Sequence, residues 1–412
     1  MTKAKIPFLI LLVMTMSLAA GFLPIQLFGF NVSGLGWFLP MLVAFYILSL
    51  NLRKAYFPIV IWAPWVALLV AHLILLNWSW LDPRVNPLQR TLQVLSPLAV
   101  GIAISTFKIT PSTLDHLNKA LRVLLYLVFF LVFFGQLQAI MAGDITGLAA
   151  QAMTAIFLGV FFITRFFIYG KWHDGFSFVL MCLVPIFAVT RSATLVIFFS
   201  AILTLARVSM KTRLLMGTLG VGAALSVFSL DRFQSKFFFS GQGSITDISL
   251  DNPDFATSGR GFLWDLLFER AMQHPWLGHG TGYGETFTYQ ISPVGYPHND
   301  WLLTFLDYGV LGVAVFAWVN VAMLYQCIKH AKQALSPQTK LFLTAGASMY
   351  IPFMMIMYTD NIMVYASFFG LLHYMVIGAG FAAYRYERSH ANQVHEYQPL
   401  TQNQTVAMRR FR

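Results

Sequence analysis

The sequence predicts an all-α membrane protein, on three observations. Hydrophobic residues make up 58% of the 412-residue chain and charged residues only 10%, whereas soluble domains are about one-quarter charged. The apolar runs are roughly 17 to 25 residues long, as transmembrane helices are, and lack the alternation of transmembrane barrel strands. Basic residues are unevenly distributed between these runs. We therefore expect a polytopic helical protein whose orientation follows from its charges.

Twelve apolar runs are candidate transmembrane helices. The first resembles a signal peptide because Lys3 and Lys5 precede it, but its apolar stretch continues past Gly21 and favours an uncleaved helix. The seventh and eighth are short and meet near Arg191. The runs cover about residues 6–29, 32–50, 56–77, 91–107, 120–141, 149–169, 175–190, 192–207, 213–230, 300–326, 341–358 and 361–384.

The charges between these runs predict that both termini are cytoplasmic. With that orientation the inner segments hold 20 of the 27 basic residues and 4 of the 16 acidic ones. The net charge of +11 then reflects topology rather than nucleic-acid binding. We expect nine transmembrane helices over 1–230, a large extracytoplasmic loop over 231–299, three further helices over 300–384 and a polar cytoplasmic tail over 385–412.

A second outer segment, 77–90, contains two tryptophans and three charged residues. Trp78 and Trp80 are typical of the membrane interface, and Asp82, Arg84 and Arg90 follow them. We interpret the segment as an interfacial belt with turn residues, in preference to a ligand contact.

Within the large loop, Ser258 is a candidate cap for an amphipathic helix over about 261–273 that would lie along the membrane surface. Arg260 stands at the start of this helix, where the macrodipole disfavours a cation. Two interpretations remain: Arg260 is a solvated surface residue, or it faces an anion attracted to the same helix end.

His298 precedes the tenth apolar run, which Asn299 or Asp300 can cap. The positive end of that helix would disfavour a protonated ring and keep the imidazole competent as a base. His-x-x-x-His and Cys-x-x-Cys spacings, typical of zinc sites, do not occur near it. The glycine-rich turn 278–284 lacks the Lys-Ser/Thr of a nucleotide-binding loop.

Arg191 stands between two apolar runs, where an arginine costs about 2.5–3.5 kcal/mol at the bilayer centre and less near an interface. At the outer end of a span it can be either a snorkelled anchor or an anion ligand. The residue alone does not separate these two roles.

Together the motifs resemble the O-antigen ligase and polymerase superfamily. The resemblance rests on an arginine opening a span at Arg191, on Arg260 with Trp264 four positions later, and on a Pro-Trp-Leu-Gly-His-Gly segment over 275–280. His298-Asn299 followed by Gly-Val-Leu-Gly over 309–312 completes the pattern. The specific motifs cover roughly 191–312.

The resemblance implies a membrane glycosyltransferase of the GT-C-like kind, in the bacterial inner membrane, with its active site at the periplasmic face. The donor would be a glycan on undecaprenyl diphosphate and the acceptor lipid A core, with inversion at the anomeric carbon. By the same resemblance Arg191, Arg260 and His298 are catalytic, and Arg191, Arg260 and Asn299 bind substrate. No metal, nucleotide or other cofactor is expected.

Other members of the superfamily have different acceptors. A polymerase transfers the glycan to another lipid-linked repeat, and an O-oligosaccharyltransferase transfers it to a protein hydroxyl. One dominant outer loop and a short tail favour the ligase. A lipid or solute transporter is the alternative from another class, but it requires polar residues near the midplane of several helices, and these spans contain few.

Overall fold

A computed structural model of the chain describes residues 5–22, 26–27, 30–76, 79, 81–141, 149–249, 252–256, 260–292 and 295–396. These residues form an all-α bundle. A two-residue antiparallel pair, β1 (Gln26–Leu27) and β2 (Phe30–Asn31), connects the first two helices. The predicted cap Ser258 and the two interfacial tryptophans, Trp78 and Trp80, lie outside the described residues.

Each of the twelve predicted spans overlaps one helix. Within the described residues, five of these helices are long and apolar enough to cross a membrane, namely α2, α5, α6, α13 and α14, and α9 makes a sixth if it forms one bent span with the short helix that follows it, Asp231–Phe237. The twelve are α1 (Phe8–Phe22), α2 (Val32–Asn51), α3 (Ile59–Leu75), α4 (Pro87–Ser105), α5 (Pro111–Met141), α6 (Ala149–Tyr169), α7 (Trp172–Phe187), α8 (Arg191–Leu203), α9 (Met210–Phe228), α13 (Asp300–Gln333), α14 (Pro337–Thr359) and α15 (Gly370–Glu396). The all-α class is confirmed, and the number of spans stays a prediction.

The segment between α9 and α13 contains three short helices, α10 (Asp231–Phe237), α11 (Arg260–Ala271) and α12 (Tyr283–Ile291). Two 3₁₀ turns, Leu52–Lys54 and Ile245–Asp247, complete the elements. α10 bends away from α9 by 81°. Leu267 of α11 packs inward against Tyr283 and Leu306, whereas Phe262 and Phe268 on the same helix are 70% and 52% exposed. Those exposed rings suit a helix that lies along a membrane surface.

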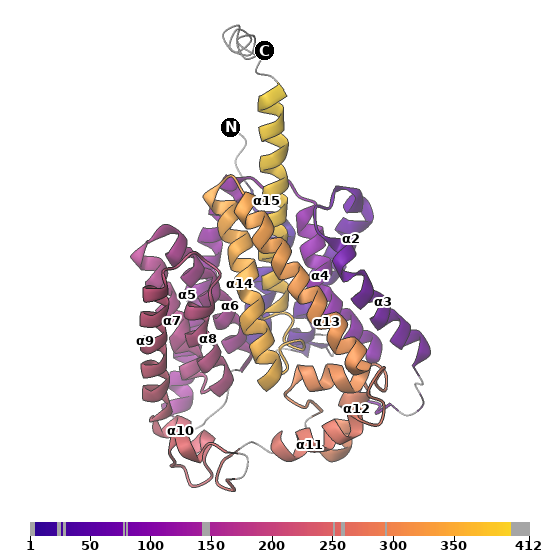
Figure 1. Cartoon of the computed structure of the whole chain (residues 1–412), viewed down its shortest axis with the longest axis vertical. Helices are drawn as coiled ribbons and strands as arrows, with labels where there is room; N and C mark the ends of the chain where they lie inside the picture. The colour runs from indigo at the N-terminus through magenta and orange to yellow at the C-terminus, as the bar shows by residue number, and fades with distance from the viewer. Residues whose placement is uncertain are drawn as a thin grey trace, which may run out of the picture.

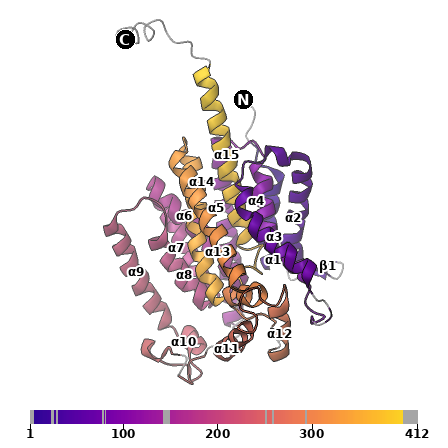
Figure 2. The ribbon, with the colours of Figure 1, turned by 45° about the vertical axis from the view of Figure 1, so that its right-hand side comes forward.

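The long helix α15 runs through the centre of the bundle, beside α13 and α14 (Figure 1). Helices α1–α4 pack on one flank and α5–α9 on the other, while α10–α12 gather at one end (Figures 1 and 2). The start of α1 and the end of α15 lie at the opposite end (Figure 1). The core is apolar and dense along α15, where Leu371, Met375 and Ile377 are fully buried.

The last helix begins at Gly370 rather than at the predicted residue 361. In the segment before Gly370, side chains from other helices form hydrogen bonds with backbone groups that would otherwise bond within a helix. Asp300 Oδ2 accepts a hydrogen bond from Met363 N at 2.8 Å, and Gln93 Nε2 donates one to Val364 O at 2.5 Å. Backbone groups with such partners need no helix to satisfy them. The irregular segment 360–369 therefore lies inside the protein between α14 and α15.

Candidate active site

His298 directly precedes α13 in a left-handed backbone conformation with φ 51°. Asn299 caps the helix: its side-chain oxygen accepts from Leu302 N at 2.9 Å. His298 Nδ1 lies 3.2 Å from Asp360 Oδ1 and 3.4 Å from Asn361 Nδ2. The carboxylate is the closer group and the only acceptor of the two, so it takes the Nδ1 proton and leaves Nε2 with a free lone pair.

Arg260 begins α11 and reaches the end of α14. Its Nη1 donates to Thr359 O at 2.8 Å, one residue before Asp360. Burial lowers the pKa of Arg260, and the nearby carboxylate of Asp360 opposes that shift. On the next turn of α11, Trp264 Nε1 donates to Pro297 O at 2.7 Å. Helix α11 is thus attached to the backbone on both sides of the pair formed by His298 and Asp360.

Arg191 begins α8 and binds the backbone of the large loop. Its Nη1 donates to Lys236 O at 2.8 Å and to Ala256 O at 2.9 Å, and its guanidinium lies 5.0 Å from the ring centre of Phe237. Lys236 Nζ in turn donates to Val189 O at 2.7 Å. These reciprocal contacts fix α10 against the start of α8.

Three cations at this end form no salt bridge among the described residues: Arg191, Lys236 and Arg260. Burial, followed by the charges of Arg191, Arg232 and Arg260, lowers the pKa of Lys236. Positive groups that lie close enough to repel one another and form no salt bridge create an electrostatic environment suited to a polyanion. We call Arg191, Lys236 and Arg260 the open cation cluster.

The segment 275–280 pairs with the backbone of α13 at a kink. The kink is at Gly309, with φ 66° and ψ −168°. A side chain on Gly309 would overlap the backbone of Trp276, so only glycine fits there. Four hydrogen bonds join the two segments: Val310 N to Pro275 O (2.8 Å), Leu311 N to Trp276 O (3.2 Å), His279 N to Leu306 O (3.0 Å) and Gly280 N to Asp307 O (2.8 Å). This part of the motif therefore attaches the loop to α13.

Arg90 forms a second ionic group with two carboxylates. Its Nε lies 3.2 Å from Glu285 Oε1 and its Nη2 3.9 Å from Asp300 Oδ1, and all three side chains are at least nine-tenths buried. The interfacial interpretation of Arg90 is wrong, because the residue lies inside the protein. Burial raises the pKa of Glu285, and Arg90 opposes the shift. We call Arg90, Glu285 and Asp300 the closed ion cluster.

The comparison with protein families identifies the region that carries these groups. Residues 176–317 match the O-antigen ligase family model. The resemblance to the O-antigen ligase superfamily is thereby confirmed. The matched region contains Arg191, Arg260, His298 and Asn299, together with Lys236, and Asp360 lies beyond it. No curated protein matches the chain.

Sequence reasoning missed two groups at this candidate site. Asp360 follows an apolar run 62 positions after His298 and belongs to no motif that we recognised. Lys236 is one of several polar residues early in the large loop. An isolated acid at the end of an apolar run was the available signal for Asp360, because an unpaired carboxylate there is costly. Asn299, predicted to bind substrate, has its side-chain oxygen engaged as the cap of α13.

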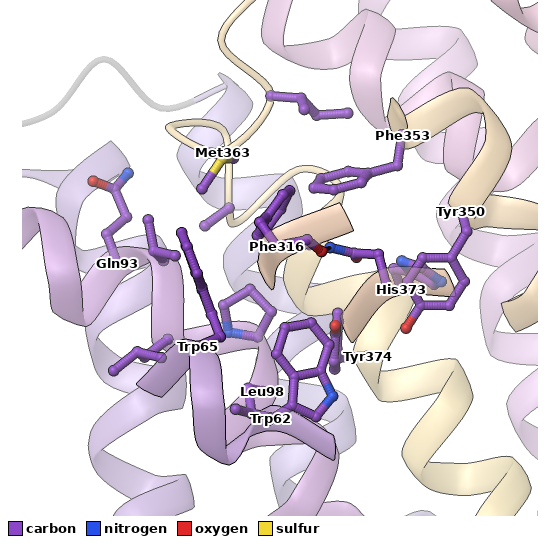
Figure 3. A pocket seen from close by; sticks show the side chains of 17 residues that line it. Trp62, Trp65, Gln93, Leu98, Phe316, Tyr350, Phe353, Met363, His373 and Tyr374 are labelled. Atoms are coloured by element: carbon purple, nitrogen blue, oxygen red, sulfur yellow. Dashed lines mark hydrogen bonds between the residues drawn. The ribbon is translucent and has the colours of Figure 1, made fainter. Parts of the chain in front are cut away.

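A separate cavity lies among α3, α4, α13, α14 and α15 (Figure 3). Its volume is about 50 Å³, and Trp62, Trp65, Phe316 and Tyr374 are among the side chains that line it. That volume holds a few water molecules and no lipid chain. His373, also in its lining, is engaged with Gly346 O at 2.7 Å. The cavity is therefore not a candidate for a lipid-linked substrate, and the candidate site remains the region around His298.

Proposed function

We propose that the protein is an O-antigen ligase that transfers a glycan from undecaprenyl diphosphate to lipid A core. One observation carries the proposal: a histidine oriented by a carboxylate lies beside an arginine of a cation cluster that forms no salt bridge among the described residues. His298, Asp360 and Arg260 meet through the end of α14. A base next to a polyanion site is the arrangement that glycosyl transfer from a lipid diphosphate requires.

In this proposal the open cation cluster binds the donor diphosphate. The guanidinium groups of Arg191 and Arg260 match phosphate oxygens as bidentate donors. Each now donates to backbone carbonyls, and each retains further N–H groups for a ligand. Their charges stabilise the leaving diphosphate as negative charge develops on it.

His298 acts as the general base. The acceptor hydroxyl oxygen attacks the anomeric carbon, and its proton moves to His298 Nε2. The bond between the anomeric carbon and the diphosphate oxygen breaks, and its electron pair leaves with the lipid diphosphate. Asp360 stabilises the imidazolium that forms, through the contact at Nδ1. Direct displacement inverts the anomeric configuration.

The proposed topology places this site at the periplasmic face of the inner membrane. We propose twelve spans with both termini in the cytoplasm, because the predicted inner segments hold 20 of the 27 basic residues. The start of α1 and the end of α15 share the end of the bundle opposite α10–α12 (Figure 1). The exposed rings of Phe262 and Phe268 would then rest on the outer leaflet.

The lipopolysaccharide made by a strain that lacks this protein tests which acceptor the protein uses. Loss of a ligase leaves bare lipid A core while lipid-linked polymer accumulates. Loss of a polymerase instead leaves core that carries one repeat, and loss of a protein-directed transferase leaves lipopolysaccharide unchanged. Either of the last two patterns contradicts the assignment to lipid A core.

A further inference from the structure

A second charged site lies at the end of the bundle opposite His298. The last turn of α6, the turn after α8, the end of α13 and the start of α14 enclose a cavity of about 270 Å³. Lys332 in its lining is 32 residues along α13 from Asp300. At 1.5 Å per residue, that is roughly 45–50 Å along the helix. This cavity is therefore separate from the proposed catalytic site.

The cavity lining has an apolar part and a cationic part. Phe167, Leu205 and Ile328 supply apolar wall, and Arg207, Lys332 and Lys340 supply charge. No carboxylate lines the cavity, and among the described residues these three cations form no salt bridge. An apolar wall beside cations suits a ligand that has a hydrocarbon part and an anionic head.

Two carboxylates contact the start of α14, Asp115 and Glu387. Asp115 Oδ2 accepts a hydrogen bond from Gln338 Nε2 at 3.4 Å. Glu387 accepts hydrogen bonds from Leu335 N at 2.9 Å and Thr339 Oγ1 at 2.6 Å, and so caps the start of α14. Because those contacts occupy Glu387, its charge does not neutralise the cavity through an ion pair with Lys332 or Lys340.

The turn that forms one side of the cavity is held in place by other residues. Arg213 Nη2 donates to Thr204 O at 2.9 Å and to Ala206 O at 3.2 Å. Leu205 N donates to Ser348 Oγ of α14 at 3.0 Å. The hydrogen bonds of Arg213 thus hold the turn in place. Arg207, which follows Ala206 in that turn, remains available to a ligand.

We propose that this cavity binds the phosphate headgroup of an anionic phospholipid. Three cations around one cavity repel one another, and a bound anion relieves that repulsion. Basic pockets between transmembrane helices recognise anionic headgroups in this way, and the apolar wall accommodates the adjoining acyl chain. Free phosphate satisfies the cations but leaves the wall exposed to water, so the lipid is the better ligand. The proposal does not depend on the reaction at His298.

Native mass spectrometry of the full-length protein with phosphatidylglycerol tests this site. The cavity variant Arg207→Gln/Lys332→Gln/Lys340→Gln should bind this lipid on the order of 100-fold more weakly, about fivefold per cation removed. The matched control Lys119→Gln/Lys211→Gln/Lys329→Gln removes the same charge from exposed residues outside the cavity lining and should bind as the wild type does. Should the cavity variant not fold, Lys340→Gln alone should show the fivefold loss.

Phosphatidylcholine and inorganic phosphate are two comparison ligands, tested by thermal unfolding. Neither should stabilise the wild type against heating at a concentration where phosphatidylglycerol does. Equal loss of binding in the cavity and control variants would show nonspecific charge attraction and overturn the site. An equal thermal shift with inorganic phosphate alone would overturn the lipid assignment.

Discussion

Two groups of charges lie at the α10–α12 end of the protein, and they differ in what neutralises them. In the closed ion cluster, Arg90 faces the carboxylates of Glu285 and Asp300 inside the protein. In the open cation cluster, the hydrogen bonds of Arg191 and Arg260 within the described part of the chain go to backbone carbonyls. The charge of a buried arginine with carboxylate partners is already neutralised, so it attracts an anionic ligand weakly. An arginine whose hydrogen bonds go to neutral carbonyls keeps its positive charge for such a ligand.

The comparison separates a structural arginine from a ligand-binding one. The closed ion cluster joins α4, α12 and α13, so its loss should appear first as lost stability. The open cation cluster forms no salt bridge in the part of the chain that the structure describes, so its loss should appear first as lost transfer. Each prediction below tests that separation.

The largest effect is expected for Arg90→Ala. Removing one partner of a buried ionic group leaves the other charges uncompensated, at a cost of about 3–5 kcal/mol. The variant should give little folded protein, measured as abundance in the membrane and as the midpoint of thermal unfolding. Arg84→Ala is the control, because Arg84 pairs with Asp82 at the exposed surface and should matter little. Equal behaviour of the two variants would contradict a structural role for Arg90.

A loss of roughly 100-fold in transfer is expected for Asp360→Asn, with normal abundance. The amide can donate to Nδ1, which favours the tautomer with its proton on Nε2 and removes the base. Steady-state transfer by the purified variant measures the effect. Asn361→Ala, at the neighbouring position, should retain most of the rate. A normal rate for Asp360→Asn would remove Asp360 from the mechanism.

Arg191→Lys and Arg260→Lys should each lower transfer by about tenfold to 100-fold, because lysine keeps the charge but loses the fork that binds two phosphate oxygens. Donor binding should weaken as well, which a titration with lipid diphosphate would detect. Arg270→Lys, in the last turn of α11 and outside the open cation cluster, is the matched control. Full activity in both site variants would leave the open cation cluster without a role.

The smallest effect is expected for Glu285→Gln, because Asp300 remains to neutralise Arg90. The change should cost roughly 1 kcal/mol or less. The raised pKa of Glu285 means that the folded protein holds this proton more tightly than the unfolded chain. Wild-type stability should therefore fall as pH rises from the ordinary value of 4.5 through the raised one. The free energy of unfolding, measured across that pH range, should fall less steeply in Glu285→Gln than in the wild type. An equally steep fall in the variant would show that other groups cause the pH dependence.

The sequence was most informative where local pattern determines structure. Each of the twelve predicted apolar runs overlaps a helix, because a long apolar segment satisfies its own backbone polar groups as a helix, while the number of membrane spans stays a prediction. The sequence prediction was wrong at residues 361–369, which were expected to be helical. There the side chains of Asp300 and Gln93 bind backbone groups in place of helical hydrogen bonds, and such long-range contacts leave no periodic signal in the sequence. Arg90 was misread for the same reason, since Glu285 lies almost 200 positions away.

The candidate site shows the same limit. Arg191, Arg260 and His298 were found because each disagrees with its local setting: a cation at a helix start, a charge between apolar runs, a histidine before a helix. Lys236 is one polar residue among several early in the large loop, and Asp360 carries only the weak signal of an acid at the end of an apolar run. Their involvement depends on tertiary contacts with Val189 and His298.

Transfer by purified His298→Ala, with donor binding measured in parallel, tests the central claim most directly. The protein should fold and bind lipid-linked donor as the wild type does, because donor affinity is assigned to the open cation cluster, while transfer falls by about 10²- to 10⁴-fold. Wild-type transfer should also fall on acidification, since a proton on Nε2 removes the lone pair that the base needs. Near-normal transfer by His298→Ala, or a wild-type rate that does not change between about pH 5 and 9, would contradict the assignment of His298 as the base.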